Sequence, residues 1–192
     1  MGQSKALMPV PPDNRPLIQH IVQRLQPLSV EGIVDRRLVI ANDPAIQTEA
    51  RLPDDISYFR DVYLDAGVLG GIATALAQCE GWALFVACDM PFLNPKLLAH
   101  LCKLTADDHW DAIVPVVDGY EQTMHALYHR RCLPAIEARL ANNQRRIVSF
   151  FDDVNVYRVS EDDIRPFDPE FHSFMNVNTP EEWSSALAMI NT

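Results

Sequence analysis

Apolar residues are spaced in two ways along the chain. Continuous apolar runs occupy 38–41, 82–87 and 112–117, and such runs are typical of strands buried on both faces of a sheet. Over 17–25, apolar residues recur every three or four positions, which predicts an amphipathic helix. Strands that alternate with helices indicate an α/β domain with a mostly parallel central sheet.

Weaker signals complete this pattern. We expect further strands at 56–59 and 154–159, and a segment at 122–128 that pairs back across a turn at Asp118-Gly119. Further helices are expected at three places: 69–78, after Asn94-Pro95, and 133–140. Thr179-Pro180-Glu181-Glu182 is a capping box that begins a terminal helix. No repeat or long linker interrupts the chain, so residues 1–192 are expected to form one domain.

Composition narrows the possible functions. The 192 residues carry a formal charge of −10, which argues against a nucleic-acid-binding surface. No apolar run approaches the ~20 residues that span a bilayer, so no membrane contact and a cytoplasmic location are expected. The four cysteines stand singly without a C-x-x-C spacing, which favours buried structural thiols over a zinc site or disulfides.

Three polar segments lie where ligands collect in α/β proteins, at the carboxyl ends of strands. Asp89 follows a strand and suits Mg²⁺, or it hydrogen-bonds its own turn. The glycine-rich segment 65–71 leads into a helix and suits either an anion or tight helix packing. Asn176 and Asn178 alternate on an extended segment, so they either present two amides to one ligand or metal or form an Asx turn.

Other candidates are weaker. His125 is the one histidine that we place on a strand facing the expected pocket, and an ordinary strand residue is the alternative. A basic stretch either attracts a phosphate or forms a solvated helix face; it comprises Arg130, Arg131, Arg139, Arg145 and Arg146.

Taken together, these segments resemble the molybdenum cofactor guanylyltransferase family over nearly the whole chain. The most specific matches are Cys-Asp-Met-Pro-Phe at 88–92 and Asn-Val-Asn-Thr-Pro-Glu at 176–181. The resemblance implies a nucleotide-diphospho-sugar transferase fold, which is a three-layer α/β/α sandwich. It also implies Mg²⁺-dependent transfer of GMP from GTP to molybdopterin-bound molybdenum cofactor, with release of pyrophosphate.

The resemblance implies a role for individual residues. Lys5 would contact the GTP phosphates, and Asp89 would bind magnesium. Substrate binding is further implied for Asn42, Asp61 and the Gly67 turn on the nucleotide side, and for Asn176 and Asn178 on the pterin or metal side. Family members also imply transient contact with other proteins of cofactor biosynthesis.

The chain departs from the family pattern at its start. Family members have a strand and a glycine-rich loop before the lysine, whereas here that lysine is residue 5. We therefore expect a domain that lacks its N-terminal strand, which would lie at the centre of the sheet. The alternatives are a related nucleotidyltransferase using CTP or a sugar phosphate, and a catalytically silent relative that binds a protein partner. Met90 favours the guanylyl branch.

Overall fold

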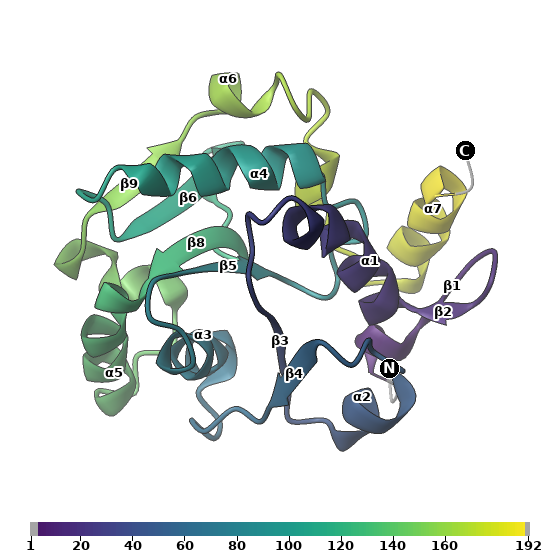
Figure 1. Ribbon diagram of the computed structural model, residues 1–192, viewed down its shortest axis with the longest axis horizontal. Helices are drawn as coiled ribbons and strands as arrows, with labels where there is room; N and C mark the ends of the chain where they lie inside the picture. Colours follow the sequence, from purple (N-terminus) through teal and green to yellow (C-terminus); the bar gives the residue numbers. More distant parts are fainter. Residues whose placement is uncertain (1–3, 191–192) are drawn as a thin grey trace.

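The computed structural model describes residues 4–190, and it has the expected α/β architecture (Figure 1). Its longer strands are β3 (Arg37–Ile40), β4 (Ile56–Phe59), β5 (Trp82–Val86), β6 (Ala112–Val117), β8 (His125–His129) and β9 (Val156–Val159). Short pairings add β1 (Pro9–Val10), β2 (Arg15–Pro16) and β7 (Tyr120–Glu121). Every strand predicted from an apolar run is confirmed, with ends that differ by no more than a few residues.

The helices are α1 (Leu17–Val30), α2 (Pro44–Glu49), α3 (Gly67–Ala77), α4 (Pro95–Lys103), α5 (Leu133–Ala141), α6 (Glu161–Ile164) and α7 (Pro180–Ile190). Short 3₁₀ turns include η1 (Lys5–Leu7) and η5 (His172–Phe174). The helix after Asn94 begins as predicted, because the Asn94 side chain accepts hydrogen bonds from the backbone N–H groups of Lys96 and Leu97. No helix within residues 4–190 is both long enough and apolar enough to cross a bilayer.

The main sheet has the strand order β5-β8-β6-β9, with β7 on the far end of β6. β8 runs antiparallel to β5 and β6, as expected for a strand that returns across the Asp118-Gly119 turn, and the short β7 is antiparallel to β6 as well. Because β5 and β6 both oppose β8, they share one direction, and β9 is parallel to β6. The sheet is therefore mixed, because the chain returns from β6 through β7 and β8 by a tight turn instead of a helical crossover.

β3 and β4 form a separate parallel pair, in register from Arg37 opposite Ile56 to Ile40 opposite Phe59. Figure 1 shows this pair below the main sheet, between α3 and α2. Within the described residues, no ladder joins β3 to β5.

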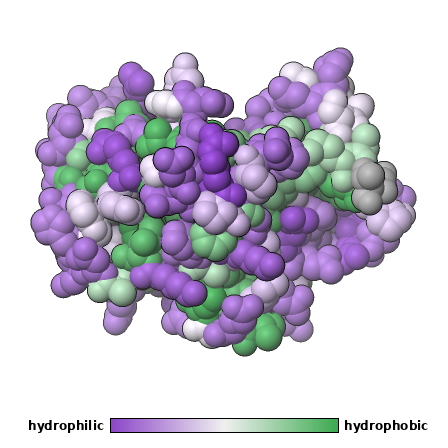
Figure 2. All heavy atoms as spheres, turned by 90° about the horizontal axis from the view of Figure 1, so that it is seen from above, coloured by the Kyte–Doolittle hydropathy of each residue, from purple (hydrophilic) through white to green (hydrophobic). Residues whose placement is uncertain are grey.

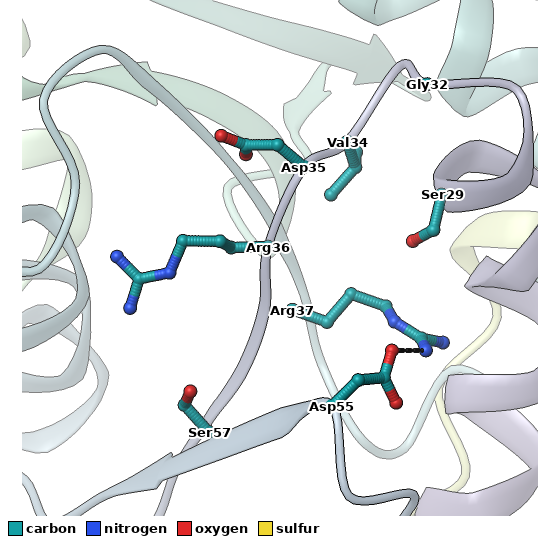
Figure 3. Close-up of a pocket in the computed structure, with 8 residues that line it drawn as sticks. All are labelled: Ser29, Gly32, Val34, Asp35, Arg36, Arg37, Asp55 and Ser57. Carbon is teal, nitrogen blue, oxygen red and sulfur yellow. Dashed lines mark hydrogen bonds and ion pairs between the residues drawn. The ribbon is translucent and has the colours of Figure 1, made fainter.

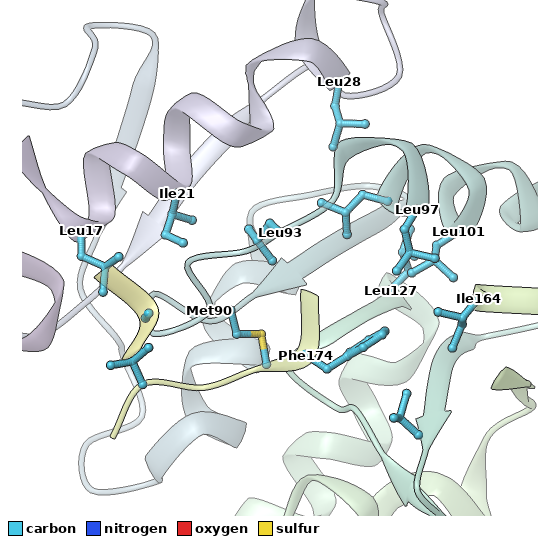
Figure 4. Packing of buried hydrophobic residues seen from close by; sticks show 14 of the residues in the cluster. Leu17, Ile21, Leu28, Met90, Leu93, Leu97, Leu101, Leu127, Ile164 and Phe174 are labelled. Carbon is cyan, nitrogen blue, oxygen red and sulfur yellow. The ribbon is translucent and has the colours of Figure 1, made fainter. Parts of the chain in front are cut away.

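Helices cover both faces of the strands, which confirms the three-layer arrangement. One apolar cluster lies between α1, α4 and the main sheet, and it includes Leu17, Ile21, Met90, Leu97 and Leu127 (Figure 4). A second cluster lies on the other face, where α3 and α5 pack on the sheet around Tyr128 and Phe150. A third, smaller cluster of Ala6, Ile18, Ile46 and Ala50 lies beside β3 and β4.

On the face drawn in Figure 2, hydrophobic residues are scattered among hydrophilic ones. Among the cysteines, Cys132 is buried and Cys79 and Cys102 are half-buried, but Cys88 is exposed. The expectation of buried thiols is therefore wrong for Cys88. This residue lies just beyond the end of β5, so the sheet does not cover its side chain.

His125 is a buried residue of β8 and has no exposed surface. Its ring packs against Phe174 at 4.6 Å between centroids, and neither ring nitrogen has a hydrogen-bond partner of ordinary geometry among the described residues. Burial lowers the pKa of His125 to about 4, although the Asp168 carboxylate acts in the opposite direction. His125 is thus the ordinary strand residue that we considered, held neutral by its surroundings.

We expect His125 to make the fold sensitive to mild acid. The unfolded chain binds a proton at this histidine near pH 6.5, whereas the folded chain does so only near pH 4, so stability is lost as the pH falls between these values. At pH 5 the loss is about 2 kcal/mol relative to pH 7.5. Urea unfolding at both pH values measures this loss of stability. His125→Leu is the control, because leucine cannot bind the proton and the variant should not show the loss. An equal pH dependence in both proteins would contradict the assignment.

Candidate active site

The end of β5 is tied to the segment that precedes α7. The backbone N–H of Val177 donates to the carbonyl oxygen of Asp89 at 2.9 Å, and the Val177 side chain is buried in the same cluster as Met90. Val177 is only 5% exposed, whereas Asn176 and Asn178 on either side are exposed. This alternation places both asparagine side chains on the solvent side of the segment, next to Asp89.

Lys5 reaches the same place from the other end of the chain. Its Nζ donates a hydrogen bond of 2.7 Å to Oδ1 of Asn178 and lies 3.8 Å from Oδ2 of Asp89. The side chains of Lys5 and Asp89 are 34% and 23% exposed, so solvent and ligands can reach both charges. The structure thus brings together three of the residues that the sequence singled out.

The backbone of Asn178 is fixed by the capping box. The carboxylate of Glu182 accepts hydrogen bonds from the N–H groups of Asn178, at 2.6 Å, and Thr179, at 3.0 Å. The hydroxyl of Thr179 accepts one from the N–H of Glu182 in return. The predicted capping box is confirmed, and it has a consequence that we did not expect: Glu182 also orients the residue that holds Lys5.

Asn42 and Asp61 form a second group, at the ends of β3 and β4. The Asn42 side chain accepts a hydrogen bond of 3.1 Å from the N–H of Asp61. One oxygen of the Asp61 carboxylate accepts from Tyr63 N–H and from the Thr74 hydroxyl, both at 2.9 Å. Asp61 therefore anchors its own turn to α3. No hydrogen bond between described residues joins this group to Lys5, Asp89 or Asn178.

We considered tight helix packing and anion binding for the glycines of α3, and different glycines fit these two roles. A Cβ at Gly70 would lie 2.7 Å from the Ala66 Cβ and 3.0 Å from an oxygen of Asp61, so Gly70 serves close packing. Gly67 instead has a φ of +63° and open space around the position of a Cβ. It begins α3 in a left-handed conformation that favours glycine and leaves this helix start accessible.

The donors around Asp89 suit a magnesium ion that takes most of its ligands from a substrate. The Asp89 carboxylate accepts no hydrogen bond from the described residues, and its backbone is bonded to Val177, which lies between the exposed residues Asn176 and Asn178. Among residues 4–190, no group of three or more acidic, histidine or cysteine side chains is arranged so that it could hold a metal ion by itself. One carboxylate plus phosphate oxygens is a usual arrangement for Mg²⁺, so the residues present fit this ion.

The basic stretch lies away from this group. Arg131 hydrogen-bonds the side chains of Asp108 and Asp111, and Arg139 pairs with Asp153. Arg130 and Arg131 follow the end of β8, which runs opposite to β5 and therefore ends at the other edge of the sheet from Asp89. Arg131 and Arg139 thus pair with carboxylates of the protein itself.

A cavity of about 270 Å³ also lies away from Asp89, at the amino end of β3. In Figure 3 the side chains of Asp35 and Arg36 lie on one side of the strand, and Arg37, paired with Asp55, lies on the other. This cavity contains none of the residues that the sequence singled out.

Comparison with known proteins agrees with this geometry. Residues 1–156 match the MobA-like NTP transferase domain family. The chain is 35% identical over 185 residues to a probable molybdenum cofactor guanylyltransferase of Methanothermobacter thermautotrophicus, covering 95% of this chain and 90% of that protein. It is 32% identical over 187 residues to the molybdenum cofactor guanylyltransferase of Vibrio parahaemolyticus, covering 94% and 85%.

Solved structures are similar as well. Molybdopterin-guanine dinucleotide biosynthesis protein A from Archaeoglobus fulgidus superposes with a TM-score of 0.83 at 25% identity, covering 99% of this chain and 92% of that one. The 2-C-methyl-D-erythritol 4-phosphate cytidylyltransferase of Thermus thermophilus shares the fold, with a TM-score of 0.69 at 16% identity over 100% and 95% of the two chains. The chain therefore belongs to the MobA-like NTP transferase family, a family of nucleotidyltransferases.

Proposed function

We propose that this protein transfers GMP from GTP to molybdopterin-bound molybdenum cofactor and releases pyrophosphate. The observation that carries the proposal is the cluster of Lys5, Asp89 and Asn178 at the carboxyl end of β5, in a chain of this family. Curated relatives that cover nearly the same length are named for this activity. We place the reaction in the cytoplasm, with transient contacts to other proteins of cofactor biosynthesis.

The reaction joins two polyanions, so charge is its first obstacle. We propose that the terminal phosphate oxygen of the pterin attacks the α-phosphorus of GTP. The new P–O bond forms as the bond between the α-phosphorus and the oxygen bridging to the β-phosphate breaks, and pyrophosphate leaves with the electron pair. Positioning and charge stabilisation then supply most of the rate acceleration, and no covalent intermediate with the protein is needed.

Lys5 is suited to hold the phosphates. A lysine ammonium has three N–H donors, and one of them is used by Asn178, so two remain for phosphate oxygens. The hydrogen bond that Lys5 donates to Asn178 fixes the direction of a lysine side chain that is otherwise flexible. Asn42 and Asp61 form the nucleotide side of the proposed site, together with the accessible helix start at Gly67.

Asp89 would hold Mg²⁺, with Asn176 and Asn178 available as amide ligands or as contacts to the pterin. When bound, this ion supplies charge neutralisation on the phosphate oxygens during departure of pyrophosphate. Asp89 also lies close enough to Lys5 to balance its charge when substrate is absent, at 3.8 Å. Both residues are partly exposed, so this ion pair contributes little to stability and can be broken by a substrate.

Ligand binding tests the base preference. With Mg²⁺ present, GTP at about one hundred times its Kd should stabilise the folded protein by about 2.7 kcal/mol, which raises Tm by roughly 5–10 °C for a domain of this size. Thermal unfolding with GTP, CTP and ATP in parallel measures the selectivity. A larger shift with CTP would favour the cytidylyl alternative, and the absence of any shift would favour a catalytically silent relative.

Removal of the Asp89 charge should stop the reaction while the fold remains. Asp89→Asn keeps the size of the side chain, and we expect turnover of GTP with the pterin substrate to fall about 100-fold or more, since a metal ion contributes several kcal/mol to such steps. Asp54→Asn is the matched control, because Asp54 is exposed and precedes β4 at the opposite edge of the sheet. Retained turnover in Asp89→Asn would exclude Asp89 as the metal ligand.

Lys5→Met tests the proposed phosphate contact. Loss of the ammonium should raise KM for GTP and lower kcat, with a combined loss in kcat/KM of roughly 100-fold, since a charged hydrogen bond lost from a site costs about 1.5–3 kcal/mol. Steady-state kinetics compares Lys5→Met with the control Lys96→Met, which removes an exposed lysine of α4. Equal kinetic constants in both variants would show that Lys5 does not touch the nucleotide.

A further inference from the structure

A larger cavity adjoins the one drawn in Figure 3. Its volume is about 480 Å³, which is within the range of small-molecule sites. Arg37 and Asp55 line both cavities, and the other walls of the larger one come from Arg15, from α1 and from the loop between α2 and β4. The larger cavity therefore lies at the amino end of β3, whereas Asn42 follows the carboxyl end of the same strand.

The α1 wall of this cavity is a row of amides. Gln19, Gln23 and Gln26 are four and three residues apart, so they share one face of the helix. The side-chain oxygen of Gln23 accepts a hydrogen bond of 3.0 Å from Nη1 of Arg15. Within residues 4–190, the Gln23 amide N–H groups, Nη2 of Arg15 and the whole Gln26 amide have no partner. Most of the groups that this wall leaves unused are N–H donors.

The loop wall presents Arg51, whose backbone is held in place. Its φ is +47°, a left-handed conformation that is unfavourable for arginine, and its carbonyl oxygen accepts a hydrogen bond of 2.8 Å from Nε2 of Gln19. Ala50, the residue before it, is fully buried in a cluster with Ile18 and Ile46. The Arg51 guanidinium, in contrast, has no hydrogen-bond or ion-pair partner in the part of the chain that the structure describes.

The lining of this cavity is positive, although the chain carries −10. Three guanidinium groups line it, from Arg15, Arg37 and Arg51, and Asp55 supplies the one carboxylate among the described lining residues. Arg37 pairs with Asp55 and lowers the pKa of that carboxyl, so Asp55 stays ionised at neutral pH. Asp13, outside the lining, pairs with Arg15. The charge of Arg51 is therefore the one that the described residues leave unpaired.

We propose that this cavity binds a phosphate monoester that has a polar organic part. Such a phosphate carries a charge of about −1.5 to −2 at pH 7 and three acceptor oxygens, which match the charge of the lining and the unused donors of Arg15 and Arg51. Arginine suits this group because its planar N–H donors bind two oxygens at once. A carboxylate has a single charge and two oxygens in one plane, so it matches the two guanidiniums less well.

The remaining volume and polar groups suit the organic part of the ligand. The cavity exceeds the ~300 Å³ at which small-molecule sites begin, so it has room for more than the phosphate. The Gln26 amide both donates and accepts, which fits hydroxyl groups. The residues of the candidate active site, Lys5, Asp89 and Asn178, are not in this lining. The proposal therefore does not depend on the proposed reaction.

Ribose 5-phosphate is a suitable probe, because it joins a phosphate to a small polyhydroxyl part and has no base. NMR of the full chain follows the side-chain N–H signals of Gln23, Gln26 and Arg51 during the titration. Salt at about 0.1 M screens attraction over distances beyond ~10 Å. We expect the three signals to shift together and to give one Kd. A similar response to ribose alone would contradict the requirement for the phosphate.

Two variants test the role of the unpaired charge. Arg51→Gln should weaken binding at least about tenfold, since it removes charged hydrogen bonds to the phosphate. Arg36→Gln is the matched control, because Arg36 is an exposed arginine that lies on the other side of β3 (Figure 3), and its Kd should be unchanged. Equal Kd values in the two variants would overturn the proposal, as would shifts confined to signals near Lys5 and Asp89. Inorganic phosphate binding as tightly as ribose 5-phosphate would overturn the assignment to a monoester.

Discussion

The hydrogen bond between Val177 N–H and the Asp89 carbonyl is the contact on which the candidate active site depends. It fixes the segment before α7 against the end of β5, and the burial of Val177 and Met90 in one cluster reinforces it. Without this contact, Asn178 would have no fixed position relative to Asp89, and Lys5 would have no amide to orient it. A buried apolar pair and one backbone bond thus determine the position of three exposed polar side chains.

Much of the fold follows from local sequence patterns. The apolar runs at 82–87 and 112–117 predict β5 and β6 because each strand is covered by helices, and Asn94-Pro95 predicts the start of α4 through its cap. The helix α2 was not anticipated, although Asp43 caps it and Pro44 occupies its first turn. It has only six residues, too few to show a helical period.

The site could be predicted in part. Asp89 and the pair Asn176 and Asn178 follow from their places after a strand and before a capping box, whereas Lys5 came only from the family resemblance. The contact between Lys5 and Asn178 cannot be deduced from spacing, because it depends on how the two chain ends pack. Nor does the sequence reveal the anchoring role of Asp61, which requires the position of Thr74 on α3. Local sequence patterns predict individual helices and strands, whereas these side-chain contacts depend on tertiary packing.

The hydrogen bond from Lys5 to Asn178 joins residues that are 173 positions apart in the chain. During synthesis, the lysine leaves the ribosome 173 residues before its partner. A nascent chain can fold β5 and α4 long before that, but it cannot assemble this cluster until the segment before α7 has emerged. A ribosome stalled before residue 178 would therefore carry a chain in which Lys5 lacks this partner.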